Sequence, residues 1–261
     1  MEIIPAILPE TFQELCGKLG VVAGAVETVQ IDFCDGRFVP NKTWPYADQQ
    51  PTTNNQQPIF EWRGKGEEGK TGDRDFDELV AEKKGLPHWE ELDFEAHLML
   101  RKPQALLPGL VKIGFFRIFL HLESFGTQMR VDEDAGGRGY RDEEFSELLH
   151  EWRDAVEVGV ALRLETPLTL LDSFAHELRS VLLMGIRRIG VQGEPFDERV
   201  ISRVRELRRR HPHLIIGVDG GVNSENARAL ADAGAGRLVV GSTIFSSPDV
   251  RAAIAQFNGL V

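Results

Sequence analysis

The sequence predicts an α/β fold built as a single (β/α)8 barrel, and two observations carry this prediction. Short apolar segments, typical of strands buried on both faces, alternate with helical patterns along most of the 261 residues. Near the C-terminus, Leu214–Val218 and Leu238–Val240 are two such segments, and glycines follow each of them directly. Parallel strands need crossover connections, so this order favours a parallel sheet. The length suits one barrel, and we expect one domain over residues 1–261.

The strands are expected wherever an apolar run of four to eight residues is bounded by turn residues. Polar residues inside these runs keep the two-residue spacing that places them on one face of a sheet. The eight segments are Glu2–Leu8, Thr28–Phe33, Phe94–Leu100, Phe116–Leu122, Gly159–Leu164, Arg187–Val191, Leu214–Val218 and Leu238–Val240.

The helices are expected between these strands, where apolar residues recur at spacings of three and four. Phe12, Leu15 and Leu19 form the first such face, and the run from Phe145 to Val156 forms the most regular one. The remaining helical patterns lie at Phe76–Lys84, Pro103–Ile113, Leu168–Leu178, Val200–Leu207, Ala227–Ala233 and Pro248–Phe257.

One segment departs from this alternation. Residues 47–74 are rich in Gln, Asn, Gly and charged residues, with a small apolar island at Ile59, Phe60 and Trp62. We interpret the segment as a polar surface insertion in the second crossover.

Composition restricts the classes of partner. The formal net charge of −11 opposes binding to nucleic acid or to an anionic membrane, because both repel an acidic surface. No apolar run is long enough to span a bilayer. Two cysteines give no disulfide framework, so a cytoplasmic location is expected. A small phosphorylated ligand remains compatible with this charge, since it responds to the local field of its pocket.

Polar side chains interrupt several of the expected strands near their C-terminal ends, where a barrel enzyme builds its site. They are Gln30, Asp32, His97, His121, Glu123 and Asp219. Two carboxylates with a histidine suit proton transfer at a carbon next to a carbonyl, one carboxylate removing a proton and the other supplying one on the opposite face. A divalent metal held by the same residues would stabilise the negative charge that develops.

The glycine turns after the last two strands predict a phosphate site. Gly220 and Gly221 follow one strand, and Gly241 and Ser242 follow the next. Such turns expose backbone N–H groups at helix N-termini, and in a barrel the phosphate site lies at these two loops.

Three segments resemble the ribulose-phosphate 3-epimerase family: VQIDFCDGRFVPNKTWP, EAHLMLRKP and VDGGV…AGAGRLVVGSTIF. The resemblance implies a ribulose-phosphate-binding TIM barrel that interconverts ketose phosphates such as D-ribulose 5-phosphate and D-xylulose 5-phosphate. It implies that Asp32 and Asp219 are the acid/base pair and metal ligands. It also implies that His97 is a ligand, that Met99 lies near the substrate, and that Gly220, Gly221, Gly241 and Ser242 bind phosphate.

Some positions differ from the family pattern. Gln30 stands where the family has a histidine ligand, so it is either a weak ligand or a structural hydrogen-bonding residue. The expected cofactor is a divalent metal of the Zn, Fe, Mn or Co type, and this substitution leaves its identity open. Ala6 stands near the position of a substrate-contacting serine, and Glu194 adds a carboxylate to the loop after the sixth strand, where it would repel phosphate unless it points away. His97 alone would be read as a core histidine, and His121 and Glu123 are expected to pair with each other.

These departures leave two alternatives to the epimerase: a phosphosugar-binding relative without turnover, and a barrel isomerase for another phosphorylated sugar. A small phosphorylated sugar is the expected partner in each case, and a homo-oligomer remains one of the alternatives for assembly.

Overall fold

The computed structural model describes residues 1–47, 72–125 and 143–260. Within them, eight parallel strands pair in chain order and β1 closes on β8, which gives a complete barrel. The strands are β1 Glu2–Ile7, β2 Thr28–Cys34, β3 Asp93–Met99, β4 Arg117–His121, β5 Glu157–Leu162, β6 Ser180–Met184, β7 Ile215–Asp219 and β8 Arg237–Val240. The predicted TIM-barrel fold class is therefore confirmed.

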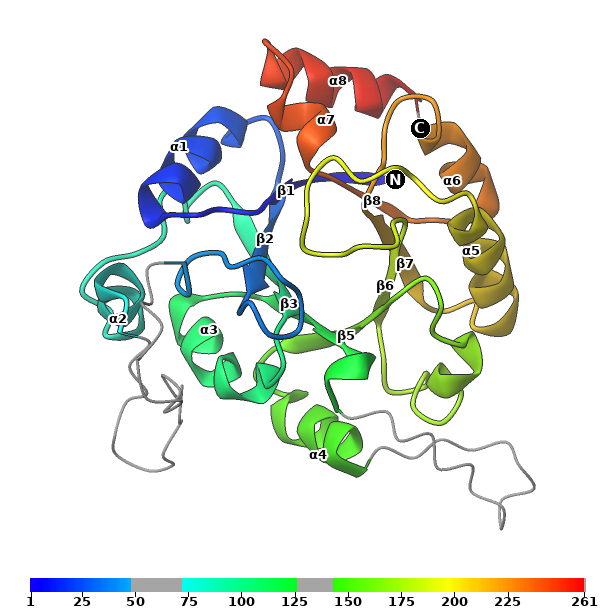
Figure 1. The fold of residues 1–261 in the computed structure, drawn as a ribbon, viewed down its shortest axis with the longest axis horizontal. Coiled ribbons are helices and arrows are strands. Elements are labelled where there is room, and N and C mark those ends of the chain that lie inside the picture. Colours follow the sequence, from blue (N-terminus) through cyan, green and yellow to red (C-terminus); the bar gives the residue numbers. More distant parts are fainter. Residues whose placement is uncertain (48–71, 126–142, 261) are drawn as a thin grey trace.

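The helices form a ring around the barrel, as the view along its axis shows (Figure 1). They are α1 Phe12–Val22, α2 Arg74–Val80, α3 Leu107–Ile113, α4 Glu143–Trp152, α5 Arg199–Arg210, α6 Ala227–Ala233, α7 Ser242–Phe245 and α8 Val250–Leu260. Side chains fix two helix starts: Thr11 accepts from the N–H of Glu14 at 3.1 Å before α1, and Asp73 accepts from the N–H of Phe76 at 2.8 Å before α2.

Two expected elements differ from the structure. The sequence pattern predicts the sixth strand at Arg187–Val191, but β6 lies earlier, at Ser180–Met184, and Gly190 has a left-handed φ of 77° inside a loop. The helix expected over Leu168–Leu178 is a 3-10 helix, η4 Leu168–Leu171, followed by turns. There Asp172 and Phe174 donate to carbonyls three residues back, so the backbone does not continue as an α-helix.

Most of the expected polar insertion, residues 48–71, lies outside the described residues, as does most of the glycine-rich segment after Ser124. The end of the expected insertion is described: α2 begins at Arg74, two residues before the expected helix. No described helix has the length and apolar character that crossing a membrane requires.

The barrel interior contains layers that follow from the alternation of side chains along each strand. On β3, Glu95, His97 and Met99 share the inner face from the N-terminal end to the C-terminal end. An apolar layer fills the middle; its buried residues are Ile4, Ala6, Phe119, Ala161, Leu182 and Val239. Polar side chains therefore lie below this layer and above it, and those above it face the end where barrel sites form.

Candidate active site

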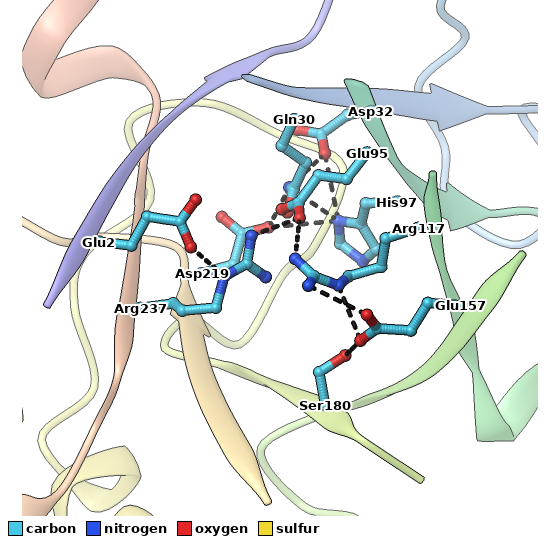
Figure 2. Close-up of polar contacts among 10 residues, drawn as sticks. All are labelled: Glu2, Gln30, Asp32, Glu95, His97, Arg117, Glu157, Ser180, Asp219 and Arg237. Atoms are coloured by element: carbon cyan, nitrogen blue, oxygen red, sulfur yellow. Dashed lines mark hydrogen bonds and ion pairs between the residues drawn. The ribbon is translucent and has the colours of Figure 1, made fainter. Parts of the chain in front are cut away.

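Asp32, His97 and Asp219 come from three strands and meet above the apolar layer. Asp32 on β2 lies beside His97 on β3 in the strand register, and Asp219 is the last residue of β7. His97 Nδ1 lies 3.2 Å from Asp32 Oδ1 and 3.2 Å from Asp219 Oδ2. His97 has no exposed surface, and each aspartate is 8% exposed. The structure thus brings together the three strongest candidates from the sequence (Figure 2).

Gln30 completes this cluster from below on β2. Its Nε2 donates to Asp32 Oδ1 at 2.8 Å and to Asp219 Oδ2 at 3.0 Å, so one amide group spans the two carboxylates. Its Oε1 is buried and has no hydrogen-bond partner among the described residues. A buried acceptor without a partner is costly.

Burial and mutual contact change the acidity of these groups. Burial raises the pKa of Asp32 to about 6, the Asp219 charge adds to that effect, and the hydrogen bond with His97 opposes it. Burial by itself would lower the pKa of His97, but its contacts with Asp219 and Asp32 outweigh burial and raise it to about 9. In the absence of a metal, protonation of His97 therefore offsets part of the negative charge of the two carboxyl groups.

The cluster fits a divalent metal on two observations. Asp32, His97 and Asp219 offer one ligand atom each, and these atoms all lie within 4.8 Å of one another. Two carboxylates with one imidazole are a donor set that divalent metals use in catalytic sites with open positions. A half-turn of the Gln30 amide would also direct its unpartnered Oε1 toward the same point.

His121 and Glu123 lie next to the cluster, one strand further round the barrel. The expected pair is confirmed, because His121 Nδ1 is 3.1 Å from Glu123 Oε2. Burial lowers the pKa of His121. Burial would raise the pKa of Glu123, but the hydrogen bond with His121 and further donors hold it at about 2.

A pocket opens above the carboxylates and is lined by all five of the predicted phosphate and substrate residues. It contains Asp32 and Asp219 in its wall, together with Met99, Gly220, Gly221, Gly241 and Ser242. The acid pair and the glycine turns therefore border one space.

The glycines after β7 are required by their conformation and by their surroundings. Gly220 and Gly221 have φ values of 100° and 69°, which favour glycine. A Cβ on Gly221 would lie 2.7 Å from the backbone of Phe196, and one on Gly220 would lie 2.6 Å from Ile186. The turn is thus pressed against the loop that follows β6.

The expected helix N-termini at the two glycine turns are present at only one of them. After β8, α7 begins at Ser242, directly after Gly241. After β7, α6 begins only at Ala227, because the side chain of Asn223 accepts from the N–H groups of Glu225 and Asn226 and forms a turn first.

Sequence reasoning missed part of the pocket wall. Met184 and Gln192 also line the pocket, and so does Glu194. The repulsion that Glu194 would exert on a phosphate is reduced, because its carboxylate is ion-paired with the exposed Arg188. The sequence marked this loop by Gly193 and Glu194, and of these three residues only Met184 and Gln192 were missed.

Two residues that hold Glu123 were also missed. The backbone N–H of Arg163 and the hydroxyl of Thr166 both donate to Glu123 Oε1. They follow β5, and no motif in the sequence marks either of them.

Fold and site together define an α/β barrel with a buried candidate metal centre beside a glycine-lined pocket. A sequence model of the ribulose-phosphate 3 epimerase family matches residues 80–245, and the chain belongs to this family. Ribulose-phosphate 3-epimerase of Bacillus subtilis is 26% identical over 265 residues, covering 99% of each chain. The enzyme of the same name from Eremothecium gossypii is 27% identical over 257 residues, covering 98% of this chain and 91% of its own.

Solved structures show the same fold at low sequence identity. A 3-hexulose-6-phosphate synthase superimposes with a TM-score of 0.61 at 14% identity and covers 100% of both chains. KGPDC from Streptococcus mutans, solved in complex with D-R5P, has a TM-score of 0.60 at 10% identity and covers 99% of this chain and 95% of its own.

Proposed function

We propose that the protein is a sugar-phosphate 3-epimerase that interconverts D-ribulose 5-phosphate and D-xylulose 5-phosphate by two-carboxylate proton transfer. The observation that carries the proposal is the meeting of Asp32 and Asp219 in the wall of the glycine-lined pocket. The names of the full-length relatives support the same substrate.

The two carboxyl groups would exchange protons with the carbon next to the substrate carbonyl. Asp32 and Asp219 come from β2 and β7, which are not neighbours in the barrel, so they can act on the two faces of a substrate held between them. Removal by one group and return by the other inverts the carbon.

Asp32, His97 and Asp219 would hold a divalent metal, with Gln30 as a weak fourth ligand through Oε1. Such an ion acts as a Lewis acid on the carbonyl oxygen and stabilises the negative charge that develops there. Ligation at His97 Nδ1 requires that nitrogen to be unprotonated, so metal uptake is coupled to proton release.

The phosphate group would bind at the other side of the same pocket, where the wall is formed by Gly220, Gly221, Gly241 and Ser242. The start of α7 would supply the backbone N–H groups of Ser242 and Thr243, whereas those of Ile244 and Phe245 donate to the carbonyl of Gly241. Met99 and Met184 would contact the carbon chain. A phosphate bound there would therefore hold the reacting carbon of the substrate at a set distance from the two carboxylates.

Solvent-deuterium incorporation tests this function. Chelator-treated protein is incubated in D2O with D-ribulose 5-phosphate, with and without Zn²⁺, Mn²⁺, Co²⁺ or Fe²⁺, and deuterium at the epimerised carbon is measured by NMR. We expect exchange with at least one ion and none after chelation. Absence of exchange with every ion would contradict the proposal.

A second candidate function follows from Gln30, whose amide bridges the two carboxylates in place of a histidine ligand. This arrangement favours a phosphosugar-binding relative without turnover. It predicts saturable binding of D-ribulose 5-phosphate in the same samples without deuterium exchange. Exchange with a different ketose phosphate alone would instead identify an isomerase for another sugar.

A further inference from the structure

A chain of buried contacts leads from the candidate metal ligand His97 to an anchored carboxylate just beyond the end of β4. His97 Nε2 lies 2.9 Å from His121 Nε2, and His121 Nδ1 lies 3.1 Å from Glu123 Oε2. Both histidines have no exposed surface. The inference drawn from this chain rests on the proposed metal-dependent function and extends it to residues outside the ligand set.

Glu123 fixes the outer end of the chain. Its Oε1 accepts from the backbone N–H of Arg163 at 2.8 Å and from the hydroxyl of Thr166. An ionised carboxylate has acceptors only, so the remaining contact, from Oε2 to His121 Nδ1, requires a hydrogen on that nitrogen. The tautomer of His121 is thereby set with Nδ1 protonated.

The tautomer of His121 in turn determines which ring nitrogen of His97 carries hydrogen. A neutral imidazole with hydrogen on Nδ1 has a bare Nε2, which can only accept. At 2.9 Å from another ring nitrogen, the hydrogen must then belong to His97 Nε2. Phe38, whose ring centroid is 5.1 Å from that of His121, covers the imidazole and keeps its orientation.

We propose that His121 and Glu123 are positioning residues that hold His97 in the tautomer with hydrogen on Nε2, so that Nδ1 presents its lone pair to the metal between Asp32 and Asp219. Nδ1 is the nitrogen that faces both aspartates, at 3.2 Å from each. Partners that hold the second nitrogen of a ligating histidine orient the ring and raise its basicity. In this chain the partner is a second histidine and not a carboxylate.

Glu123→Gln is the sharpest variant, because it keeps the shape of the side chain and reverses one hydrogen bond. The backbone N–H of Arg163 would hold the amide oxygen at the Oε1 position, so the amide NH2 would face His121 Nδ1. His121 would then carry hydrogen on Nε2, and His97 would be driven to the tautomer with hydrogen on Nδ1. We expect the dissociation constant for Zn²⁺ to rise about 10- to 100-fold, measured by calorimetric titration.

The direct readout is the tautomer itself. Two-bond ¹H–¹⁵N spectra of ¹⁵N-labelled, Zn²⁺-loaded wild-type protein should show His97 with metal on Nδ1 and hydrogen on Nε2, and His121 with hydrogen on Nδ1 and none on Nε2. The His121 tautomer is the deciding signal, because metal on His97 Nδ1 leaves hydrogen on Nε2 with or without a positioning partner. Hydrogen on His121 Nε2 would overturn the role, and this measurement needs no variant, so it holds even if Glu123→Gln is unstable. Glu165→Gln is the matched control, since Glu165 is exposed and pairs with Arg199; its Zn²⁺ affinity should equal that of the wild type.

Two further results would overturn the positioning role: ligation of His97 through Nε2, or wild-type Zn²⁺ affinity in a folded Glu123→Gln variant. Failure of the wild-type protein to bind either Zn²⁺ or Mn²⁺ would remove the metal-dependent function and the positioning role together. Normal metal binding without deuterium exchange would remove only the function.

Discussion

The barrel holds buried charges in two layers, and they are neutralised in opposite ways (Figure 2). Below the apolar layer, guanidinium groups supply the positive charge. Arg237 pairs with Glu2 at 2.9 Å and also with Glu95. Arg117 pairs with Glu95 at 3.0 Å and with Glu157 at 2.8 Å. Each carboxylate of this lower layer therefore contacts a permanent cation.

The upper layer has no such permanent cation in the ion pairs of the described residues. There Asp32 and Asp219 contact the imidazole of His97 and the neutral amide of Gln30. The charge of the two carboxylates is offset, in part, only while the imidazole carries a proton or another cation is present.

The acidities of the two layers reflect this difference. Burial by itself would raise the pKa of Glu2 and of Glu157, but Arg237 acting on Glu2 and Arg117 acting on Glu157 outweigh burial and lower it. In the upper layer burial prevails and the pKa of Asp32 rises to about 6. Arginine keeps its proton at any accessible pH, whereas histidine does not. The positive charge of the lower layer is therefore fixed and stabilises the barrel, whereas that of the upper layer changes as His97 gains or loses a proton.

The largest expected effect is the loss of deuterium exchange in Asp32→Asn and in Asp219→Asn. Removal of a general acid or base costs about 10²- to 10⁴-fold in rate. Exchange is measured with each variant, together with its metal content and its denaturant midpoint. Asp232→Asn on α6 is the matched control, because Asp232 is exposed and pairs with Arg228 on the same helix. Retained exchange in either site variant would show that the upper layer does not carry the chemistry.

Arg237→Met should have the next largest effect, on stability and not on the site. It removes the partner that Glu2 and Glu95 share, and loss of one member of a buried ion pair costs about 3–5 kcal/mol. The free energy of unfolding is measured by denaturant titration, with Arg237→Lys as the charge-retaining variant. The exposed Arg228→Met should change it by less than about 0.5 kcal/mol. A changed metal affinity in folded Arg237→Met would show that the lower layer also influences the candidate metal site.

The smallest effect is a pH dependence with opposite signs in the two layers of the metal-free protein. His97 has a pKa raised from 6.5 to about 9, so its contribution to stability is complete below pH 6.5 and is lost as pH rises through 9. Glu2 and Glu157 have a pKa lowered from 4.5, so their contribution is present above pH 4.5 and is lost as pH falls below it.

The free energy of unfolding of the chelator-treated protein, measured from about pH 3 to about pH 10, reports both the loss of stability at acid pH and the loss at alkaline pH. His97→Gln should flatten the alkaline side only, and Glu157→Gln the acid side only. Flattening of the opposite side by either variant would show that the layers titrate together.

Much of the fold was predictable because the strands are apolar runs with regular crossovers. The sixth strand was misplaced although the apolar run VLLM at 181–184 marks it, whereas the expected segment at 187–191, RRIGV, contains two arginines. Gly190 has a left-handed φ, and a Cβ at this position would lie 2.6 Å from the Val39 side chain. Both features are set by tertiary packing, which the local sequence does not encode.

The candidate site was predictable residue by residue but not as a network. Asp32, His97 and Asp219 stand out as polar residues at strand ends, and a family motif supports each of them. The contact between His97 and His121 depends on the pairing of β3 with β4 and on the ring orientations, which no spacing along the chain encodes.

The charged residues of the lower layer were missed for the same reason. Glu95, Arg117 and Arg237 each stand as one charged residue in an apolar strand. Their partners lie on other strands, so these ion pairs form only once the strands have come together in the barrel.

The apolar layer separates the two sets of charges on β1, β4, β5, β6 and β8, whereas on β3 Glu95 and His97 are successive residues of the inner face. Phe119 belongs to it and borders the lower charges, with the Arg237 guanidinium carbon 5.8 Å from its ring centroid. Among the described ion pairs, none joins Asp32, His97 or Asp219 to a charged residue of the lower layer, so the lower salt bridges do not include any of the candidate metal ligands. The chain carries glutamine at position 30, where its amide bridges the two carboxylates, within a barrel whose lower salt bridges do not include this residue.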